Sequence, residues 1–140
     1  MTEQALSVLV VDDDDITAEL VERALRRVEG AFEVISAPDG VSALAMMRGR
    51  PGGVERPYVV LLDLNMPRMN GFEFLDVLRS DPGLRDSVVF ILSTSAADGD
   101  LRRAYERYVA GYMVKSRVGP QFAQVSRLLR DFSETICLPQ

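Results

Sequence analysis

The chain has 140 residues, with 16 basic and 21 acidic side chains and a net charge of −5. This length supports one domain with a real core, and the acidic balance argues against a nucleic-acid or membrane partner, since both need a basic face. The absence of histidine excludes histidine catalysis and histidine-ligated zinc, and the single cysteine, Cys137, excludes an intrachain disulfide. Residues 1–4 do not begin a signal peptide, and no apolar run approaches the roughly 20 residues that cross a bilayer. We therefore expect a cytoplasmic protein.

Short apolar runs alternate along the chain with segments of helical periodicity. Residues 8–11 form the first run, whose continuous apolarity predicts a strand buried on both faces. Apolar residues then recur at spacings of three and four over 16–28, which predicts an amphipathic helix ending near Gly30. A second strand is predicted over residues 32–37 and a short helix over 41–47.

The second half of the chain continues the same alternation. Residues 49–57 contain two prolines and three glycines and are predicted to form a surface loop. The remaining predicted elements are a strand over 58–62, a helix from Gly71 to residue 80, a strand over 88–92, a helix capped by Asp98 and running to Tyr108, a strand over 112–114 and a helix over about 120–134.

Five strand–helix units in strict alternation predict a parallel sheet covered by helices on both faces, because parallel strands need crossover connections. Five units are too few for an eight-stranded barrel, so the predicted architecture is an open, doubly wound sheet. In such sheets the functional site lies at the carboxyl ends of the strands. The residues that follow the predicted strands are therefore candidates for chemistry.

Polar and charged residues follow four of the five predicted strands. In the doubly wound order these four strand ends are neighbours, so their side chains are expected to face one another. They are Asp12 to Asp15 after the first strand, Asp63 and Asn65 after the third, Ser93 to Ser95 after the fourth, and Lys115 after the fifth.

The acidic residues at these strand ends predict a metal site. Carboxylates gathered in a cleft repel one another, and either raised pKa values or a bound cation relieves that repulsion. An all-oxygen ligand set without His or Cys favours Mg²⁺, with Mn²⁺ as the alternative. Asp14 and Asp15 are explained instead as acids at the positive end of a helix dipole, which leaves Asp12, Asp13 and Asp63 for the metal.

Asp63 has two interpretations. It could simply end its strand, or, with a metal to neutralise charge and Lys115 to pair with incoming oxygens, its carboxylate could attack phosphorus and form an acyl phosphate. Ser93 could hydrogen-bond the phosphoryl group or be a solvated turn serine, and the turn interpretation is the better one for Ser95. In isolation Tyr112 reads as a structural residue at the start of a strand.

Five motifs resemble the receiver domain of bacterial two-component response regulators. The distance from Asp63 is 8 residues to Gly71, 30 to Ser93 and 52 to Lys115, in agreement with that family. The resemblance covers about residues 6–131. The motifs are Val10-Val11-Asp12-Asp13, Leu62-Asp63-Leu64-Asn65-Met66-Pro67, Asn70-Gly71, Ser93-Thr94 and Tyr112-Met113-Val114-Lys115.

The resemblance implies a flavodoxin-like fold with strand order 2-1-3-4-5 and a role for each matching residue. Asp63 matches the phosphoacceptor, Asp12 and Asp13 match the acids that hold Mg²⁺ together with Asp63, and Asn65 matches the residue that gives a backbone carbonyl to the metal. The other matches are Lys115 to the phosphate-pairing lysine, Ser93 to the switch hydroxyl and Tyr112 to the aromatic residue that turns inward with it.

One position departs from the family pattern, because the lysine is usually followed by a proline joined through a cis peptide bond. Here Ser116 follows Lys115. A cis bond without proline costs roughly 2.5–4 kcal/mol, so we expect a trans bond or a rearranged loop at this point.

The resemblance also implies organisation and partners. We expect one receiver domain over 1–140, with 132–140 as a C-terminal extension and no output domain. Five further features are similar to the stand-alone regulators paired with bacterial phytochromes: the Gly/Pro loop before the third strand, Phe74-Leu75, Asp81-Pro82, Leu92-Ser93-Thr94-Ser95 and Ile136-Cys137-Leu138-Pro139. The expected partner is therefore a sensor histidine kinase, specifically a bacteriophytochrome, with a downstream target that the sequence does not identify. Phe132, Ile136 and Leu138 are expected to lie beyond the cover of the sheet and to support a homodimer through the C-terminal region.

Two other functions are open at this point. A haloacid-dehalogenase-type aspartate phosphatase resembles Asp12-Asp13-Asp14, but it expects Thr or Val where Ile16 stands, and its cap domain does not fit this length. A pseudo-receiver that binds partners without phosphorylation is disfavoured because every acceptor-site residue is present. The favoured function is a phosphorelay switch that assists only its own phosphorylation and dephosphorylation and is not otherwise an enzyme.

Overall fold

The computed structural model of the chain describes residues 5–49 and 53–140, and its five strands form one parallel sheet in the order β2-β1-β3-β4-β5. The predicted doubly wound fold is therefore confirmed. The strands are β1 (Leu6–Val11), β2 (Phe32–Ala37), β3 (Tyr58–Leu62), β4 (Val88–Ser93) and β5 (Gly111–Val114). The helices are α1 (Asp15–Leu25), α2 (Gly40–Met47), α3 (Gly71–Ser80), α4 (Asp98–Tyr105) and α5 (Ala123–Thr135), with 3₁₀ turns η1 (Lys115–Arg117) and η2 (Pro120–Phe122) before α5.

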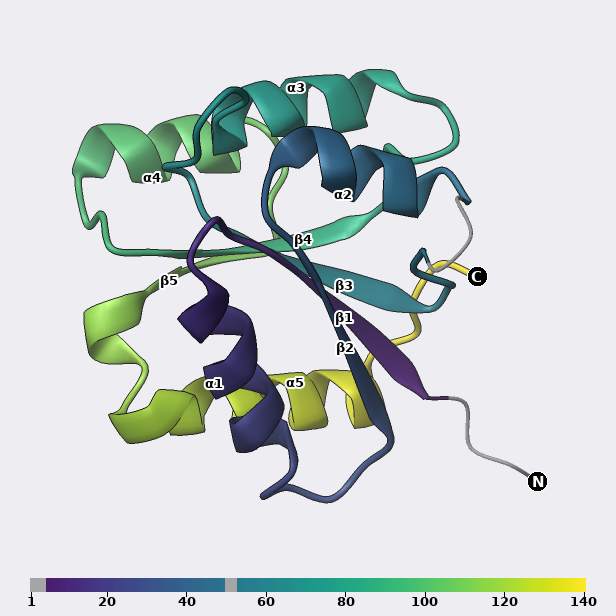
Figure 1. The fold of residues 1–140 in the computed structure, drawn as a ribbon, viewed down its shortest axis with the longest axis vertical. Helices are drawn as coiled ribbons and strands as arrows, with labels where there is room; N and C mark the ends of the chain where they lie inside the picture. The colour runs from purple at the N-terminus through teal and green to yellow at the C-terminus, as the bar shows by residue number, and fades with distance from the viewer. Residues whose placement is uncertain (1–4, 50–52) are drawn as a thin grey trace.

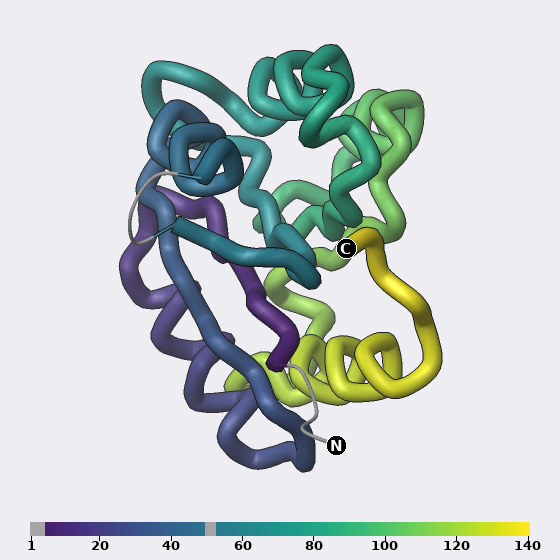
Figure 2. The backbone as a smooth tube through the Cα atoms, turned by 90° about the vertical axis from the view of Figure 1, so that its right-hand side faces the viewer, coloured from purple at the N-terminus to yellow at the C-terminus, as the bar shows by residue number. Residues whose placement is uncertain are grey.

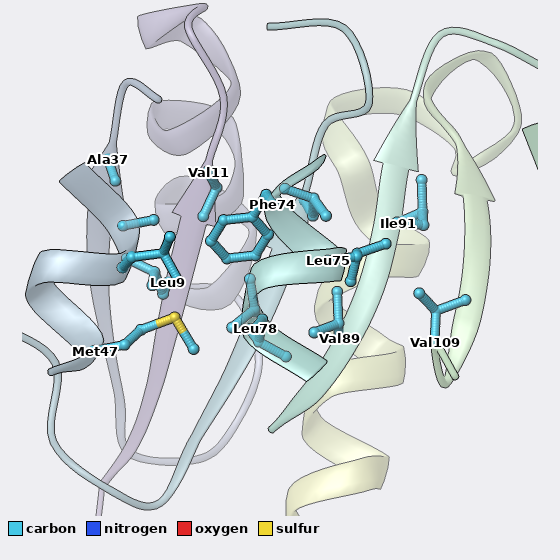
Figure 3. Close-up of a cluster of buried hydrophobic side chains, with 14 of the residues drawn as sticks. Leu9, Val11, Ala37, Met47, Phe74, Leu75, Leu78, Val89, Ile91 and Val109 are labelled. Atoms are coloured by element: carbon cyan, nitrogen blue, oxygen red, sulfur yellow. The ribbon is translucent and has the colours of Figure 1, made fainter. Parts of the chain in front are cut away.

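Helices α2, α3 and α4 cover one face of the sheet, and α1 and α5 cover the other (Figure 1). Each face has its own buried apolar cluster. Figure 3 shows Phe74 and Leu75 of α3 directed at Val11 and Ile91 of the sheet, in the cluster on the α2–α4 face. The central strands β1 and β3 are buried along their whole length, which explains their continuous apolar sequence.

Polar caps fix where three of the helices begin, and this in turn sets the loops that follow the strands. At the start of α1 the Asp14 side chain accepts a hydrogen bond from the Ile16 N–H. At the start of α2 the Asp39 side chain accepts one from the Ser42 N–H. Asn70 and Glu73 form a reciprocal capping box at the start of α3. Asp14 and Asp15 therefore lie at the start of α1, as predicted; Asp14 is the cap of the helix and Asp15 belongs to its first turn.

Several predicted helix limits were wrong. Helix α1 ends at Leu25 rather than near Gly30, and Ile16 lies outside its buried stripe with 59% of its surface exposed. Helix α4 ends at Tyr105, and Asp98 is its first residue rather than its cap, because the chain turns at Ala97 without a side-chain cap. Tyr108, the predicted end of that helix, has a left-handed backbone with φ of 61°.

The segment between β5 and α5 also differs from the single helix predicted from residue 120. Gln121 and Phe122 both have left-handed backbone angles, and α5 begins only after them. Bulky residues rarely adopt this conformation. The burial of the Phe122 ring in the apolar cluster on the α1–α5 face compensates for the strain.

After α5 the C-terminal residues leave the α1–α5 layer and run across the edge of the sheet at which the strands begin (Figure 2). Phe132 packs edge-on against Phe90, with ring centroids 5.3 Å apart, and Leu138 packs against the same cluster, so neither is uncovered as predicted. Ile136 keeps 46% of its surface exposed, as expected for it. Leu128, in the middle of α5, is 37% exposed.

Two predictions concern segments that the structure covers only in part. Residues 1–4, predicted not to begin a signal peptide, lie outside the described residues, as do residues 50–52 of the predicted loop. Within the part of the chain that is described, no helix combines the length and the apolarity needed to cross a membrane.

Candidate functional site

The register of the central strands places two acids side by side at the carboxyl edge of the sheet. Val11 of β1 pairs with Leu62 of β3, so the next residues, Asp12 and Asp63, leave the sheet together. The ladder continues into both, because the Asp63 N–H donates to the Val11 carbonyl at 2.9 Å and the Asp12 N–H donates to the Ala37 carbonyl at 3.1 Å. Both acids are 7% exposed, so their positions are set by the sheet rather than by flexible loops.

Asp13 completes a cluster of three carboxylates. One oxygen from each of Asp12, Asp13 and Asp63 lies within 4.8 Å of the other two. Asp13 is exposed whereas the other two are buried, so one side of the cluster is open to solvent and to incoming oxygen ligands. Three carboxylate oxygens without nitrogen or sulfur ligands fit a hard divalent cation such as Mg²⁺ or Mn²⁺, which keeps several waters.

Lys115 lies at the same edge, directly after β5. Its ammonium group is 2.7 Å from Asp12 Oδ2, while Asp12 Oδ1 accepts a hydrogen bond from the Asp14 N–H at 2.9 Å. It is the only lysine in the chain, since the other 15 basic residues are arginines. The Lys115–Ser116 bond is trans, because the one cis bond within the described residues precedes Pro57. The trans bond predicted for this position is therefore confirmed, and the chain continues from it into the 3₁₀ turn η1.

The surroundings of Asp63 raise the pKa of its carboxyl group above the ordinary value. Burial raises the pKa of its carboxyl group, and the negative charges of Asp12 and Asp13 raise that pKa further. The ammonium group of Lys115 and a backbone hydrogen bond from Asn65 lower the pKa, but they do not cancel the rise. A cation at the cluster would act in the same direction as the lysine and keep Asp63 ionised.

Ser93 and Tyr112 are linked through the backbone of Ser95. The Ser93 side chain is fully buried at the end of β4 and accepts a hydrogen bond from the Ser95 N–H at 3.3 Å. The Tyr112 hydroxyl donates to the Ser95 carbonyl oxygen at 3.0 Å. Burial raises the pKa of Tyr112, so the phenol stays protonated as a donor.

Ser95 was interpreted as a solvated turn serine, and this was wrong. Its hydroxyl donates to Asp100 Oδ2 at 2.6 Å and accepts from the Ala97 N–H at 3.3 Å, so it organises the start of α4. The signal was present in the sequence as Ser95-Ala96-Ala97-Asp98, because a serine three residues before an acid is typical of a helix start.

The loop after β3 holds Asn65 and Gly71 close to Asp63. Asn65 is exposed, and its backbone N–H is the one that reaches the Asp63 carboxylate. The Gly71 N–H donates to the Leu64 carbonyl at 2.9 Å. A Cβ at Gly71 would lie 2.8 Å from the Asp63 carbonyl oxygen, so only glycine allows α3 to start this close to the site.

Asp14 does not join the cluster, and this bears on the phosphatase alternative. An Asp-x-Asp site would need the carboxylates of both Asp12 and Asp14, but the Asp14 side chain is occupied as the cap of α1. The geometry therefore disfavours a haloacid-dehalogenase-type site.

A parallel five-stranded sheet with three acids, a lysine and a buried hydroxyl at its carboxyl edge defines a class of phosphoacceptor signalling domains. Comparison with known proteins agrees: residues 8–124 match the family described as response regulator receiver domain. The chain belongs to this family. The match gives no support to the phosphatase alternative.

Several relatives and solved structures are similar over nearly the whole chain. Response regulator Rcp1 of Synechocystis is 33% identical, over 94% of this chain and 92% of Rcp1. The probable methanogenesis regulatory protein FilR2 of Methanothrix harundinacea is 34% identical, over 94% of this chain and 84% of FilR2. The crystal structure of the phosphorylated cyanobacterial phytochrome response regulator RcpA matches with a TM-score of 0.85 at 31% identity, over 98% of this chain and all of that one. The Mn²⁺-bound form of Rcp1 matches with a TM-score of 0.83 at 31% identity, over 96% and 99%.

Proposed function

We propose that this receiver domain accepts a phosphoryl group on Asp63 from the phosphohistidine of a sensor histidine kinase. The single observation that carries the proposal is the cluster at the carboxyl edge of the sheet. One carboxylate oxygen of Asp63 lies within 4.8 Å of an oxygen of Asp12 and of Asp13, and the Lys115 ammonium group lies 2.7 Å from Asp12. Because the chain has no histidine, the donor must be another protein or a small phosphorylated molecule. A cytoplasmic location follows from a kinase donor that uses ATP.

In the proposed reaction a carboxylate oxygen of Asp63 forms a bond to phosphorus while the bond from phosphorus to the donor's imidazole nitrogen breaks. The electron pair of the broken bond stays on that nitrogen, which takes up a proton from solvent. The Lys115 ammonium group pairs with a phosphoryl oxygen, and the Ser93 hydroxyl hydrogen-bonds another. The product is an acyl phosphate on Asp63.

Asp12, Asp13, Asp63 and the backbone carbonyl of Asn65 would hold Mg²⁺, or Mn²⁺ in its place. The bound ion would neutralise charge on the phosphoryl oxygens. The fit is supported by the all-oxygen cluster in this chain and by the Mn²⁺-bound structure of Rcp1. Asp13, as the exposed member, leaves room for waters and for an oxygen of the phosphoryl group.

Phosphorylation would be transmitted through Ser93 and Tyr112. When the Ser93 hydroxyl turns to the phosphoryl group, its 3.3 Å hydrogen bond from the Ser95 N–H changes. Because the Tyr112 hydroxyl donates to the Ser95 carbonyl oxygen, a change in the Ser95 backbone also reaches Tyr112. Tyr112 lies on β5, the edge strand between α4 and α5, so the consequence is a changed surface there.

A bacteriophytochrome is the kinase that the comparisons favour. RcpA is a phytochrome response regulator, and its structure matches 98% of this chain. Phosphotransfer from a purified bacteriophytochrome kinase, compared with unrelated histidine kinases, tests this choice. The choice of a bacteriophytochrome would be contradicted if all kinases transferred phosphate equally well. It would also be contradicted if the unrelated kinases transferred phosphate and the bacteriophytochrome did not.

A homodimer through the C-terminal region also belongs to the proposal. It rests on Ile136, which is 46% exposed, and on a hollow of about 350 Å³ that this residue lines with Leu6, Pro57 and Leu138. Light scattering over a concentration series should show a dimer that Ile136→Asp abolishes. A monomer at high micromolar concentration would rule it out.

The main experiment is phosphotransfer with Asp63→Asn beside the matched control Asp14→Asn. Both variants replace one acid, but Asn serves as well as Asp in the capping role of Asp14. We expect one Mg²⁺-dependent phosphoryl group on the wild type and on the control, and none on Asp63→Asn. The proposal fails if no kinase and no small phosphodonor labels the wild type, or if the protein turns over phosphomonoesters many times.

A further inference from the structure

The loop between β3 and α3 begins with the phosphoacceptor and contains a strained turn in its middle. Asp63 begins the loop, and Asn65, whose backbone N–H reaches the Asp63 carboxylate, follows two residues later. Arg68, further along, has a left-handed backbone with φ of 67°. A residue with a Cβ rarely adopts this conformation and keeps it only where its surroundings fix the chain. Contacts outside the turn must therefore hold it in place.

Met69 attaches the turn to the rest of the fold. Its N–H donates to the Pro67 carbonyl at 2.7 Å, so the residues around Arg68 close a tight turn. Pro67 and Arg68 are exposed, whereas Met69 packs against the apolar cluster on the α2–α4 face. Before the turn the chain is held by Met66, which is buried in the same cluster. After the turn it is held by the Met69 side chain.

The Met69 side chain lies against Gly40, the first residue of α2, and α2 and α3 lie side by side on this face (Figure 1). A Cβ at Gly40 would be 2.7 Å from Met69 Sδ and 3.1 Å from its Cγ. The backbone of Gly40 is not left-handed, so no unusual φ requires glycine there. The space is what requires it, and Met69 occupies that space with Phe74 of α3 beside it.

A second contact joins the same two segments but is weak. The Arg68 guanidinium group is 3.9 Å from Oδ2 of Asp39, the residue that caps α2. The Arg68 side chain is 80% exposed, so solvent screens this ion pair and it contributes little. The packing of Met69 against Gly40 therefore decides where the turn lies relative to α2.

We propose that Gly40 and Met69 are positioning residues for the metal site. Packed against Gly40, the Met69 side chain holds the turn at 67–69 and, through it, the backbone of Asn65, whose carbonyl would bind Mg²⁺. Neither residue belongs to the acidic cluster. Groups behind the ligands of a metal site orient those ligands, and their replacement weakens metal binding. The inference rests on the proposed function and deepens it, because it names residues that set the affinity of the site for its cation.

Gly40→Ala separates this role from a role in folding. The added methyl group would meet the flexible Met69 side chain at its closest approach, so Met69 can move while α2 stays intact. Alanine is also the better helix former, which offsets part of the cost in stability. The variant should therefore stay folded and lose cation affinity because Met69 has moved away from residue 40.

The test measures binding of Mn²⁺ to the full chain from the electron paramagnetic resonance signal of the free ion. Gly40→Ala, Met69→Ala and the double variant are compared with the wild type and with Met46→Ala. Met46 is the matched control, because it is a partly buried methionine of the same apolar cluster near the other end of α2. Thermal unfolding in EDTA gives the stability of each variant without the ion.

We expect Gly40→Ala and Met69→Ala each to weaken Mn²⁺ binding about tenfold, as changes behind metal ligands do. The double variant should lose no more than one single variant, because both substitutions remove the same contact. Met69→Leu keeps the volume of the side chain and should bind Mn²⁺ as the wild type does. Met46→Ala should lower the Tm in EDTA and leave the Mn²⁺ affinity unchanged.

Three results would overturn the inference. The first is unchanged Mn²⁺ affinity in Gly40→Ala and Met69→Ala, and the second is a double variant in which the two losses multiply. The third is an equal loss in Met46→Ala, because the effect would then come from a general loosening of the core. If Met69→Ala does not fold, the comparison of Gly40→Ala with Met46→Ala decides the question.

The failure of this inference and of the proposed function can be told apart. Labelling of Asp63 by a small phosphodonor is followed on the same samples as the Mg²⁺ concentration is raised. Gly40→Ala should need about tenfold more Mg²⁺ for half of its maximal rate and should reach the wild-type rate at saturation. If the wild type neither binds Mn²⁺ nor is labelled, the proposed function fails. If the wild type does both and the variants match it, only the positioning role is excluded.

Discussion

The Nζ atom of Lys115 lies 2.7 Å from Oδ2 of Asp12, a carboxylate that also belongs to the acidic cluster. The lysine and a divalent cation therefore compete for the same carboxylate group. Whatever binds to Asp12 also determines whether the ammonium group is free to pair with a phosphoryl oxygen.

Lys115→Met should bind Mg²⁺ more tightly than the wild type, because the cluster loses its internal counter-ion. The expected gain is several-fold, since a nearby charge pair in this setting is worth about 1 kcal/mol. Phosphorylation of Asp63 should nevertheless fall at saturating Mg²⁺, because the phosphoryl oxygen has lost its partner. Isothermal titration measures the first effect and labelling the second, and weaker Mg²⁺ binding in the variant would contradict the argument.

Asp63→Asn should make the protein more stable at pH 7 when a chelator removes divalent cations. Burial and the neighbouring acids raise the pKa of Asp63, so the folded state favours the protonated group. Its contribution to stability is fully present below the ordinary carboxyl value of 3.8 and is lost as the pH rises through the raised pKa. The variant avoids that loss at neutral pH, and the difference should narrow as the pH falls.

Calorimetry in EDTA at several pH values measures this effect, because a change of about 1 kcal/mol moves the Tm of a domain of this size by several degrees. Asp14→Asn is the matched control and should show no such gain. Added Mg²⁺ should stabilise the wild type and not Asp63→Asn. A lower Tm for Asp63→Asn in EDTA at pH 7 would show that the carboxylate is not under the repulsion described here.

Gly71→Ala should destabilise the protein and slow phosphorylation, because the new methyl group would meet the Asp63 carbonyl oxygen and the Leu64 Cα at 2.8 Å. Overpacking of this kind costs about 1–3 kcal/mol. Gly99→Ala is the control: nothing lies within 4 Å of a Cβ there, and alanine in the first turn of α4 should add about 0.5–1 kcal/mol of stability. Urea denaturation measures both, and equal effects of the two substitutions would contradict the steric argument.

The contact between Phe72 and Arg103 should appear as a coupling free energy between α3 and α4. Helix α4 has one buried residue, Ala104, so little apolar burial holds it in place. A double-mutant cycle of Phe72→Leu and Arg103→Gln should give a coupling of about 0.5–2 kcal/mol. The same cycle with Arg102→Gln should be additive, because Arg102 has no such contact among the described residues; coupling in both cycles would point to a general change in α4.

The carboxyl edge of the sheet could be predicted from the sequence because it depends on local rules that agree with one another. The apolar runs that end at Asp12 and Asp63 define buried parallel strands, and the parallel arrangement brings their ends together. Once the register pairs Val11 with Leu62, no other placement of the two acids is available.

The helix ends could not be predicted to the same degree, because tertiary contacts decide them. Gln121 and Phe122 take left-handed angles because the Phe122 ring is buried under α1, and nothing in the local sequence requires this. Ile16 has the right spacing for a buried stripe, but α1 begins so close to the site that its first turn extends into solvent. Periodicity identifies a helix but does not show which turn lies beyond the sheet.

Arg79 illustrates a structural role without any sequence signal. Its guanidinium group donates to the carbonyl oxygens of Arg85, Ser87, Arg107 and Tyr108, at 2.7–2.9 Å. It therefore joins the loops that precede β4 and β5. A single arginine at the end of a helix is ordinary in sequence, and only the fold brings four carbonyl groups to it.

Because Lys115 is the only lysine in the chain, its ammonium group is also the only side-chain amine that an acylating reagent can modify. Its reactivity depends on the strength of the pairing with Asp12, which a cation or a phosphoryl group would change. A single mass increment on one peptide would therefore report the state of the site in a native mixture, without a label or an engineered probe. Acylation of Lys115 can therefore be used to follow whether the site holds a cation or a phosphoryl group.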